Sequence, residues 1–196
     1  DASSPHLLIA GITGSGKSVA LNTILRGLCR QYGPDKLQMN LVDPKAADLL
    51  IFEESPHLVG EIGWDAEDAS RALEELVEEM QRRSQIFKEH DRATNLQQFN
   101  ERVSAENRLP WRLVVLDEYA DLTSDKEDRQ AVEKPLFRLC SKGRSLGINV
   151  IVATQRPSAD IITSKIRSNF TAKLALRVAS GTESRLILDE SGAETL

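Results

Sequence analysis

The sequence predicts an α/β protein with a mostly parallel sheet and helices on both faces of that sheet. Three observations support this: short apolar runs alternate with segments of helical periodicity, the first run leads into a glycine-rich turn, and later runs end in polar residues. Short apolar runs without alternation are typical of buried parallel strands. Strands that alternate with helices indicate a doubly wound sheet. With 196 residues, 40% of them hydrophobic, the chain is expected to form a single domain, residues 1–196.

Strands are expected at residues 6–10, 37–42, 112–116, 149–153 and 172–178. Helices are expected at residues 17–31, from 65 to about 88, and at 128–141, with a short helix in the polar connection 91–110. The long helix has Asp65 as a plausible N-cap, and acidic residues crowd its first turns, as the helix dipole prefers. Pro135 falls inside the helix predicted at 128–141, where it could introduce a kink or begin a second helix.

The net charge of −5 hides an uneven distribution. The stretch 138–185 carries nine basic and two acidic residues, so its net charge is +7 and that of the remainder is −12. Such a stretch can mark an anion-facing surface, or its residues can line solvated faces or contact a nucleotide. The two cysteines, far apart in sequence, fit a reducing compartment better than a disulfide framework.

The apolar runs are strand-sized, and the polar start Asp1-Ala2-Ser3-Ser4-Pro5 does not resemble a signal peptide. We therefore expect a cytoplasmic domain. Because the first residue is not methionine, we expect an excised part of a larger protein, which could be anchored to a membrane only through segments absent from this chain.

The clearest motif is Gly11-Ile12-Thr13-Gly14-Ser15-Gly16-Lys17-Ser18, placed between a predicted strand and a predicted helix. This is the spacing and context of a phosphate-binding loop. Its glycines allow several backbone N–H groups to point at one anion, and the following helix adds positive potential. Lys17 would reach the β and γ phosphates of ATP, and the Ser18 hydroxyl would ligate Mg²⁺. The residues expected to bind the nucleotide are Thr13, Gly14, Ser15, Gly16, Lys17 and Ser18.

A second motif, Leu113-Val114-Val115-Leu116-Asp117-Glu118, is an apolar strand that ends in two carboxylates. Asp117 at the strand tip would hold the Mg²⁺ shell, and Glu118 would polarise the attacking water. An acidic pair after a strand can also be a helix cap, but together with a phosphate-binding loop it indicates an ATPase. The intact Glu118 favours hydrolysis over nucleotide binding alone.

Two further residues follow from their positions. Gln155 ends the fourth predicted strand, where an amide could contact the γ phosphate, although a loop glutamine with no such role is the commoner case. Arg144 lies in the glycine-flanked stretch 143–147 just before that strand. It could serve as an arginine finger for a neighbouring subunit, or it could be an ordinary surface arginine.

Taken together, the motifs resemble the motor core of FtsK/SpoIIIE DNA translocases. The resemblance covers almost the whole chain in the family's order, from Pro5-His6-Leu7-Leu8-Ile9-Ala10-Gly11 to Ser184-Arg185-Leu186-Ile187-Leu188-Asp189. It includes Val42-Asp43-Pro44-Lys45, Ser55-Pro56-His57-Leu58, Glu79-Met80-Gln81-Arg82-Arg83, Asp117-Glu118-Tyr119-Ala120-Asp121-Leu122, Gly143-Arg144 and Ala153-Thr154-Gln155-Arg156-Pro157-Ser158.

This resemblance implies a RecA-like motor that hydrolyses Mg²⁺-ATP in a homo-oligomeric ring, typically a hexamer, around double-stranded DNA. It implies that Arg144 is the arginine finger acting on the neighbouring subunit and that Gln155 senses the γ phosphate. It also implies that the loops with Arg156 and Arg185 face the DNA. Several family members carry a lysine where this chain has Gly181. The membrane-spanning segment and winged-helix module of cell-division members are absent from this sequence.

Other functions of related motors remain open. Type VII secretion ATPases, which move proteins, resemble this chain at residues 143–147, but they tend to have an Asp-Phe-Lys-Gly-Gly type sequence where this chain has Asp43-Pro44-Lys45-Ala46-Ala47. That difference favours the DNA branch. Motors of conjugation and DNA-defence systems are further alternatives, as is a module that binds ATP to assemble a ring without turnover.

Overall fold

The computed structural model describes residues 5–90 and 93–196 and contains five parallel strands. They are β1 (His6–Ala10), β2 (Leu37–Val42), β3 (Trp111–Leu116), β4 (Ile148–Thr154) and β5 (Ala172–Ala175). Their order in the sheet is β2-β3-β4-β1-β5. The predicted fold class is therefore confirmed, and each strand begins within one residue of its expected start.

Seven helices connect or follow these strands in the described residues. They are α1 (Lys17–Gln31), α2 (Ala66–Glu89), α3 (Leu96–Arg102), α4 (Tyr119–Leu122), α5 (Lys126–Lys142), α6 (Ser164–Asn169) and α7 (Gly181–Leu188). Asp65 caps α2, as predicted, by accepting a hydrogen bond from the backbone N–H of Asp68. The short helix expected in 91–110 is α3, while residues 91 and 92 lie outside the described residues.

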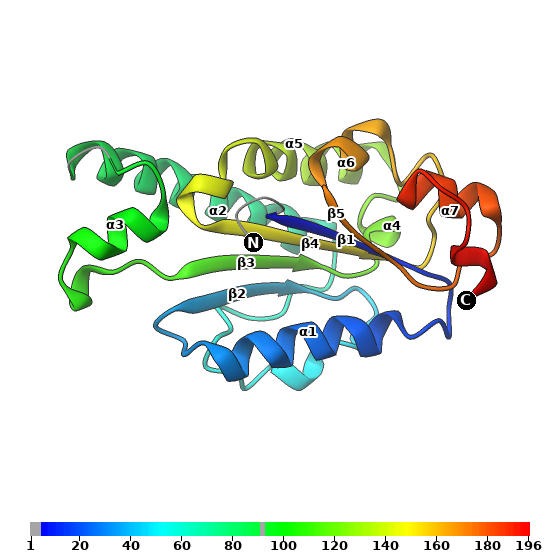
Figure 1. The fold of residues 1–196 in the computed structure, drawn as a ribbon, viewed down its shortest axis with the longest axis horizontal. Coiled ribbons are helices and arrows are strands. Elements are labelled where there is room, and N and C mark those ends of the chain that lie inside the picture. The colour runs from blue at the N-terminus through cyan, green and yellow to red at the C-terminus, as the bar shows by residue number, and fades with distance from the viewer. Residues whose placement is uncertain (1–4, 91–92) are drawn as a thin grey trace.

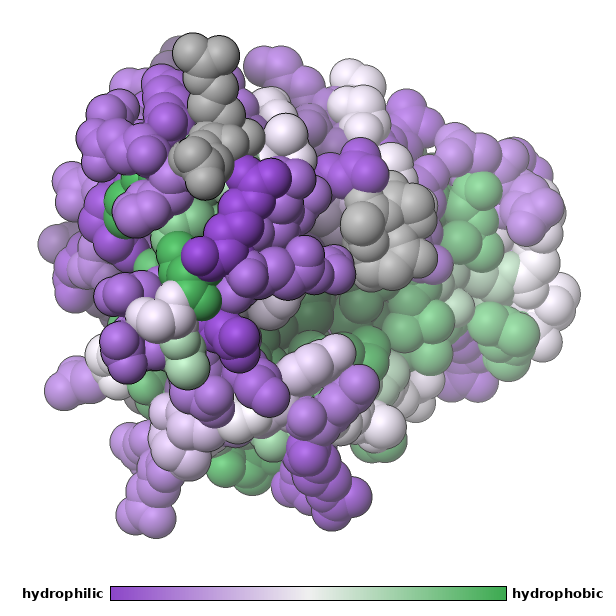
Figure 2. Space-filling model, turned by 60° about the vertical axis from the view of Figure 1, so that its left-hand side comes forward, coloured by the Kyte–Doolittle hydropathy of each residue, from purple (hydrophilic) through white to green (hydrophobic). Residues whose placement is uncertain are grey.

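Side chains that alternate along the strands supply two separate cores, one on each face of the sheet. In β1, Leu8 and Ala10 belong to the core under α2, α4, α5, α6 and α7, whereas Ile9 belongs to the core under α1. In Figure 1, α1 lies below the sheet, and α5 and α6 lie above it. The face drawn in Figure 2 shows hydrophilic side chains over most of its area, with apolar patches between them.

Two predicted boundaries differ from the structure by more than one residue. Helix α5, predicted to begin at about residue 128, begins at Lys126, because Asp125 caps it by accepting hydrogen bonds from the backbone N–H groups of Glu127 and Asp128. Strand β5 ends at Ala175, not at residue 178. Leu176 and Arg177 still bond to Ala10 and Ile12, but the backbone N–H of Val178 bonds to the carbonyl of Ala193.

Pro135 neither ends α5 nor begins a second helix. A proline removes the N–H that would otherwise bond to the carbonyl four residues earlier, which here belongs to Ala131. That carbonyl instead accepts a hydrogen bond from the Ser70 hydroxyl of α2, at 3.2 Å. The contact between α2 and α5 thus supplies the missing donor and lets the helix continue.

Candidate functional site

The glycine-rich loop lies between β1 and α1, as expected, and its backbone needs glycine at two positions. Gly14 and Gly16 have φ angles of 79° and 93°, which side chains rarely tolerate. Gly16 also precedes α1 without supplying a side-chain cap. The Ser15 hydroxyl is buried without a hydrogen-bond partner in the described residues. Unsatisfied donors at the start of a helix form a binding site for an anion such as phosphate.

The two motifs meet at the carboxyl ends of β1 and β3. Lys17 and Asp117 are both almost fully buried, and the Lys17 ammonium donates a hydrogen bond to Asp117 Oδ1. The Ser18 hydroxyl donates to Asp48, 30 residues further along the chain. Because parallel strands place their carboxyl ends at one edge of the sheet, residues far apart in sequence come together there.

The side chains of Ser18 and Asp117 are of the kinds that bind Mg²⁺, and the buried Asp117 carboxylate needs a positive partner, which in this structure is Lys17. Burial pushes the pKa of Asp117 above its usual value, and Lys17 opposes that effect by direct contact. If Lys17 turned to a phosphate, the buried Asp117 carboxylate would need another positive charge. A magnesium ion, which prefers carboxylate, hydroxyl and water oxygens, would supply it and would neutralise phosphate charge.

Glu118 is 1% exposed, and both of its carboxylate oxygens are engaged. Oε1 accepts hydrogen bonds from the Thr154 hydroxyl at 3.2 Å and the Gln155 backbone N–H at 3.0 Å. Oε2 accepts one from the Lys45 ammonium at 2.8 Å. Burial alone would raise the pKa of Glu118, but the hydrogen bonds from Lys45 and from the Gln155 N–H lower it below the usual range.

Gln155 lies beside the phosphate-binding loop. Its side-chain oxygen accepts a hydrogen bond from the Thr13 hydroxyl at 2.8 Å. The structure therefore brings together, at one edge of the sheet, nearly all the residues that the sequence predicted for one nucleotide site. They are Thr13, Gly14, Ser15, Gly16, Lys17, Ser18, Asp117, Glu118 and Gln155.

Arg144 does not join this group. It begins the 3₁₀ turn Arg144–Leu146, which leads into the amino end of β4, whereas the phosphate-binding loop follows the carboxyl end of β1. Since β1 and β4 are parallel, Arg144 lies at the opposite end of the sheet. Its side chain is exposed and has no ion pair or hydrogen bond within the described part of the chain.

The two arginines predicted to bind DNA both have local partners. Arg156, directly after β4, forms an ion pair with Asp121, and its side chain remains 61% exposed. Arg185, in α7, is exposed and donates a hydrogen bond to the Ser191 hydroxyl at 2.6 Å. Pairs this exposed contribute little to stability, so a phosphate group can displace either partner at small cost.

The sequence did not indicate three of the residues that the structure places at the site. Lys45 and Thr154 contact Glu118, and Asp48 contacts Ser18. The family resemblance included Asp43-Pro44-Lys45, but it gave Lys45 no role. Asp48 had no signal in the sequence, because its contact depends on how the loop after β2 folds back.

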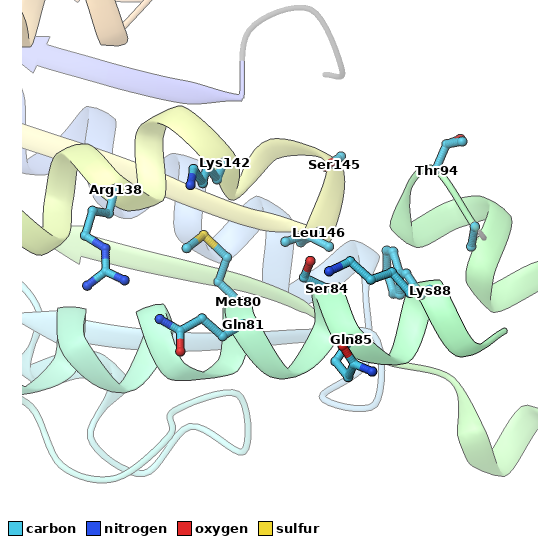
Figure 3. A pocket seen from close by; sticks show the side chains of 12 residues that line it. Met80, Gln81, Ser84, Gln85, Lys88, Thr94, Arg138, Lys142, Ser145 and Leu146 are labelled. Atoms are coloured by element: carbon cyan, nitrogen blue, oxygen red, sulfur yellow. The ribbon is translucent and has the colours of Figure 1, made fainter.

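A separate groove lies between α2 and α5, at a distance from the phosphate-binding loop. Its volume is about 760 Å³, and none of the predicted site residues lines it. Figure 3 shows Gln81 and Ser84 on α2 facing Arg138 and Lys142 on α5. The groove is open and basic, and the nucleotide site does not include it.

Comparison with known proteins decides the family. The model of the FtsK/SpoIIIE family matches residues 1–159. The chain belongs to the FtsK/SpoIIIE family. Among curated relatives, DNA translocase FtsK of Lactiplantibacillus plantarum is 41% identical over 98% of this chain, and DNA translocase SftA of Bacillus subtilis is 42% identical over 98%. This FtsK/SpoIIIE chain spans only 25% and 20% of those two proteins.

Solved structures of other ATPases share the fold of this FtsK/SpoIIIE chain. The pCW3 conjugation coupling protein TcpA, determined with ATPγS, is 32% identical, with a TM-score of 0.85 over 97% of this chain and 54% of TcpA. The type VII secretion ATPase EccC of Thermomonospora curvata is 28% identical, with a TM-score of 0.85 over 98% of this chain and 23% of that protein. The fold is that of a RecA-like P-loop ATPase. In the part of the FtsK/SpoIIIE chain that the structure describes, no helix is both long and apolar enough to cross a membrane.

Proposed function

We propose that residues 1–196 form the motor domain of an ATP-driven translocase of double-stranded DNA. The observation that carries this proposal is the buried arrangement of Lys17, Asp117 and Glu118 around the phosphate-binding loop, in a chain similar over 98% of its length to DNA translocases. The loop would hold the ATP phosphates, and Ser18 and Asp117 would hold Mg²⁺. The ion would stabilise the negative charge on the transferred phosphoryl group.

The residues of this chain suggest how hydrolysis proceeds. Glu118 would accept a proton from a water molecule while the water oxygen bonds to the γ phosphorus. The bond from that phosphorus to the bridging oxygen breaks, and its electrons leave with ADP. Gln155, already beside Thr13, would contact the γ phosphate and report its loss to the loop that contains Arg156.

The position of Arg144 supports a site shared between subunits. At the opposite end of the sheet it cannot reach its own phosphate-binding loop. Its guanidinium is exposed and has no partner among the described residues, so it suits the site of a neighbour. Repetition of that contact around a closed ring, a hexamer in our proposal, would complete every active site. An isolated monomer would then bind ATP but hydrolyse it slowly.

The DNA contacts would come from Arg156 and Arg185. Both are exposed, and both lie in the stretch 138–185 that carries a net charge of +7. Contacts of this kind to phosphates are largely independent of base sequence and weaken with salt. We place the domain in the cytoplasm, with any membrane anchor of the parent protein outside this chain.

The test is ATPase activity of a ring-forming protein with and without linear duplex DNA, at low and moderate salt. We expect DNA to stimulate the wild type, and Glu118→Gln to bind ATP without consuming it. ATP binding without hydrolysis in both the wild type and Glu118→Gln would instead indicate a module that binds ATP to assemble a ring without turnover. No stimulation by DNA at either salt concentration would refute DNA as the cargo.

A mixture of two inactive variants tests the shared site. Arg144→Ala subunits keep Glu118, and Glu118→Gln subunits keep Arg144, so an equal mixture should recover up to about a quarter of wild-type activity in a randomly assembled ring. A mixture as inactive as either variant alone would contradict the assignment of Arg144 to the neighbouring site.

A second candidate function is a protein-export or conjugation motor, because type VII secretion ATPase EccC and conjugation coupling protein TcpA share this fold with TM-scores of 0.85. An export motor would be stimulated by a peptide export signal and would not respond to DNA. A conjugation or defence motor would respond to DNA, so only the parent polypeptide would separate it from a cell-division translocase.

A further inference from the structure

Lys45 donates a hydrogen bond to Oε2 of Glu118 from a partly exposed side chain, whereas the partners of Oε1 lie in and directly after β4. The partners of Oε1 are the hydroxyl of Thr154, which is fully buried, and the backbone N–H of Gln155 at the end of β4. The partner of Oε2 is the ammonium of Lys45, on a side chain that is 44% exposed. Lys45 therefore occupies an acceptor position on Oε2 that a water molecule could otherwise use.

The backbone around Lys45 is fixed, although its side chain is not. The carboxylate of Asp43 accepts four hydrogen bonds, from the backbone N–H groups of Lys45, Ala47, Asp48 and Leu49. Ala46, next in the chain, has a φ of 49°, an uncommon conformation for a residue with a side chain. An anchored backbone with a side chain that is 44% exposed suits a residue that exchanges one anionic partner for another.

Two lysines pair with the two adjacent carboxylates of this site. Lys17 contacts Asp117, and Lys45 contacts the adjacent Glu118. A triphosphate entering the loop would compete with both carboxylates for these ammonium groups, and it carries more charge than either. Because Lys17 is expected to turn to the phosphates, the same argument applies to Lys45, whose partner is the expected base.

We propose that Lys45 is a second phosphate-directed lysine, which holds Oε2 of Glu118 before ATP binds and then moves to the γ-phosphate oxygens, freeing the base. This inference rests on the nucleotide site proposed above. Because ADP has no γ phosphate, ADP leaves Lys45 on Glu118. Lys45 thus distinguishes ATP from ADP and prevents Glu118 from accepting a proton until a substrate is present.

The electrostatics of the pair agree with this exchange. Burial alone would lower the pKa of Lys45, but its hydrogen bond to Glu118 and the nearby charges of Asp121 and Asp117 raise it. Lys45 therefore stays charged near neutral pH, as a phosphate ligand must.

The experiment is calorimetric binding of ATPγS and of ADP, each with Mg²⁺, to the wild type and to Lys45→Met. We expect Lys45→Met to weaken ATPγS binding by roughly tenfold or more, the effect of losing one charge-assisted contact, and ADP binding by less than about threefold. Lys134→Met, which changes an exposed lysine of α5, should alter neither affinity. Equal losses for both nucleotides, or no loss for ATPγS, would overturn the proposal.

A second pair of variants separates direct contact from simple neutralisation of Glu118. If Lys45 reaches the phosphate, Lys45→Met should still weaken ATPγS binding when Glu118→Gln is already present. If the loss disappears in that background, Lys45 acts only by masking the Glu118 charge, and the proposal is wrong. Failure of the wild type to bind ATPγS would instead refute the nucleotide site itself, which keeps the two failures distinct.

Discussion

Replacing Asp43 with alanine tests whether one buried carboxylate holds the loop that carries Lys45 and Asp48. Asp43 is fully buried, and its two oxygens accept four backbone hydrogen bonds at 2.8 to 3.1 Å. The variant removes every one of these acceptors. The loop would therefore lose its only common anchor among the described residues. Lys45, which contacts Glu118, and Asp48, which contacts Ser18, would lose their positions.

The size of the effect follows from which N–H groups water can reach. Lys45 and Ala47 are exposed, so water replaces much of what their N–H groups lose, whereas Asp48 is half-buried and Leu49 is fully buried. With about 1.5 kcal/mol for each hydrogen bond to a charged group that water cannot replace, Asp43→Ala should lower the free energy of unfolding by about 3 kcal/mol.

Urea unfolding, followed by circular dichroism, measures this difference. The control is Glu74→Ala, which changes an exposed acidic residue of α2 and should shift the free energy of unfolding by less than about 0.5 kcal/mol. A loss below about 1 kcal/mol in Asp43→Ala would refute the reasoning, because it would mean that the four hydrogen bonds contribute little beyond those that water provides.

Other predictions concern α2 and α5. Arg83 is fully buried, with Nε bonded to Glu79 at 2.6 Å and a second nitrogen bonded to the Leu146 carbonyl. Glu79→Ala should therefore lower the free energy of unfolding in urea by roughly 3 kcal/mol or more. A loss equal to that in Glu78→Ala would contradict this. Burial alone would raise the pKa of Glu79, but Arg82 and Arg83 lower it below its usual value. The stability from this pair is therefore present at neutral pH and is lost as the pH falls through the depressed pKa. The drop in the urea midpoint between neutral and acidic pH should therefore be smaller in Glu79→Gln than in the wild type, and an identical drop would count against the pair. Finally, Ser70→Ala should lower the free energy of unfolding by about 1 kcal/mol in the wild type. It should change that free energy almost not at all in the Pro135→Ala background, because alanine restores an N–H donor for the Ala131 carbonyl. Equal losses in both backgrounds would show that Ser70 does not replace the missing N–H.

The sequence was sufficient for the local features of this chain. The apolar runs located all five strands of the described residues. For β1, β3 and β4 the reason is that a strand buried on both faces needs apolar side chains at nearly every position. Asp65 was recognised as an N-cap because capping depends on residues three or four apart. The phosphate-binding loop was recognisable because the constraints on Gly14 and Gly16 are local to the backbone.

The tertiary structure decided what depends on contacts between distant segments. From the sequence, Pro135 could kink its helix or begin a second one. In the structure the helix continues, because the Ser70 hydroxyl of another helix bonds to the carbonyl that Pro135 leaves without a donor. Asp48 and Lys45 entered the site only because the loop after β2 folds over Asp43. The parallel pairing of β1 and β4 placed Arg144 at the far end of the sheet from the phosphate-binding loop, and its role as an arginine finger stays a prediction. Caps and turns depend on residues close together in the sequence, so the sequence shows them directly. The partners of Glu118 lie 36 to 73 positions away and contact it only when the sheet forms.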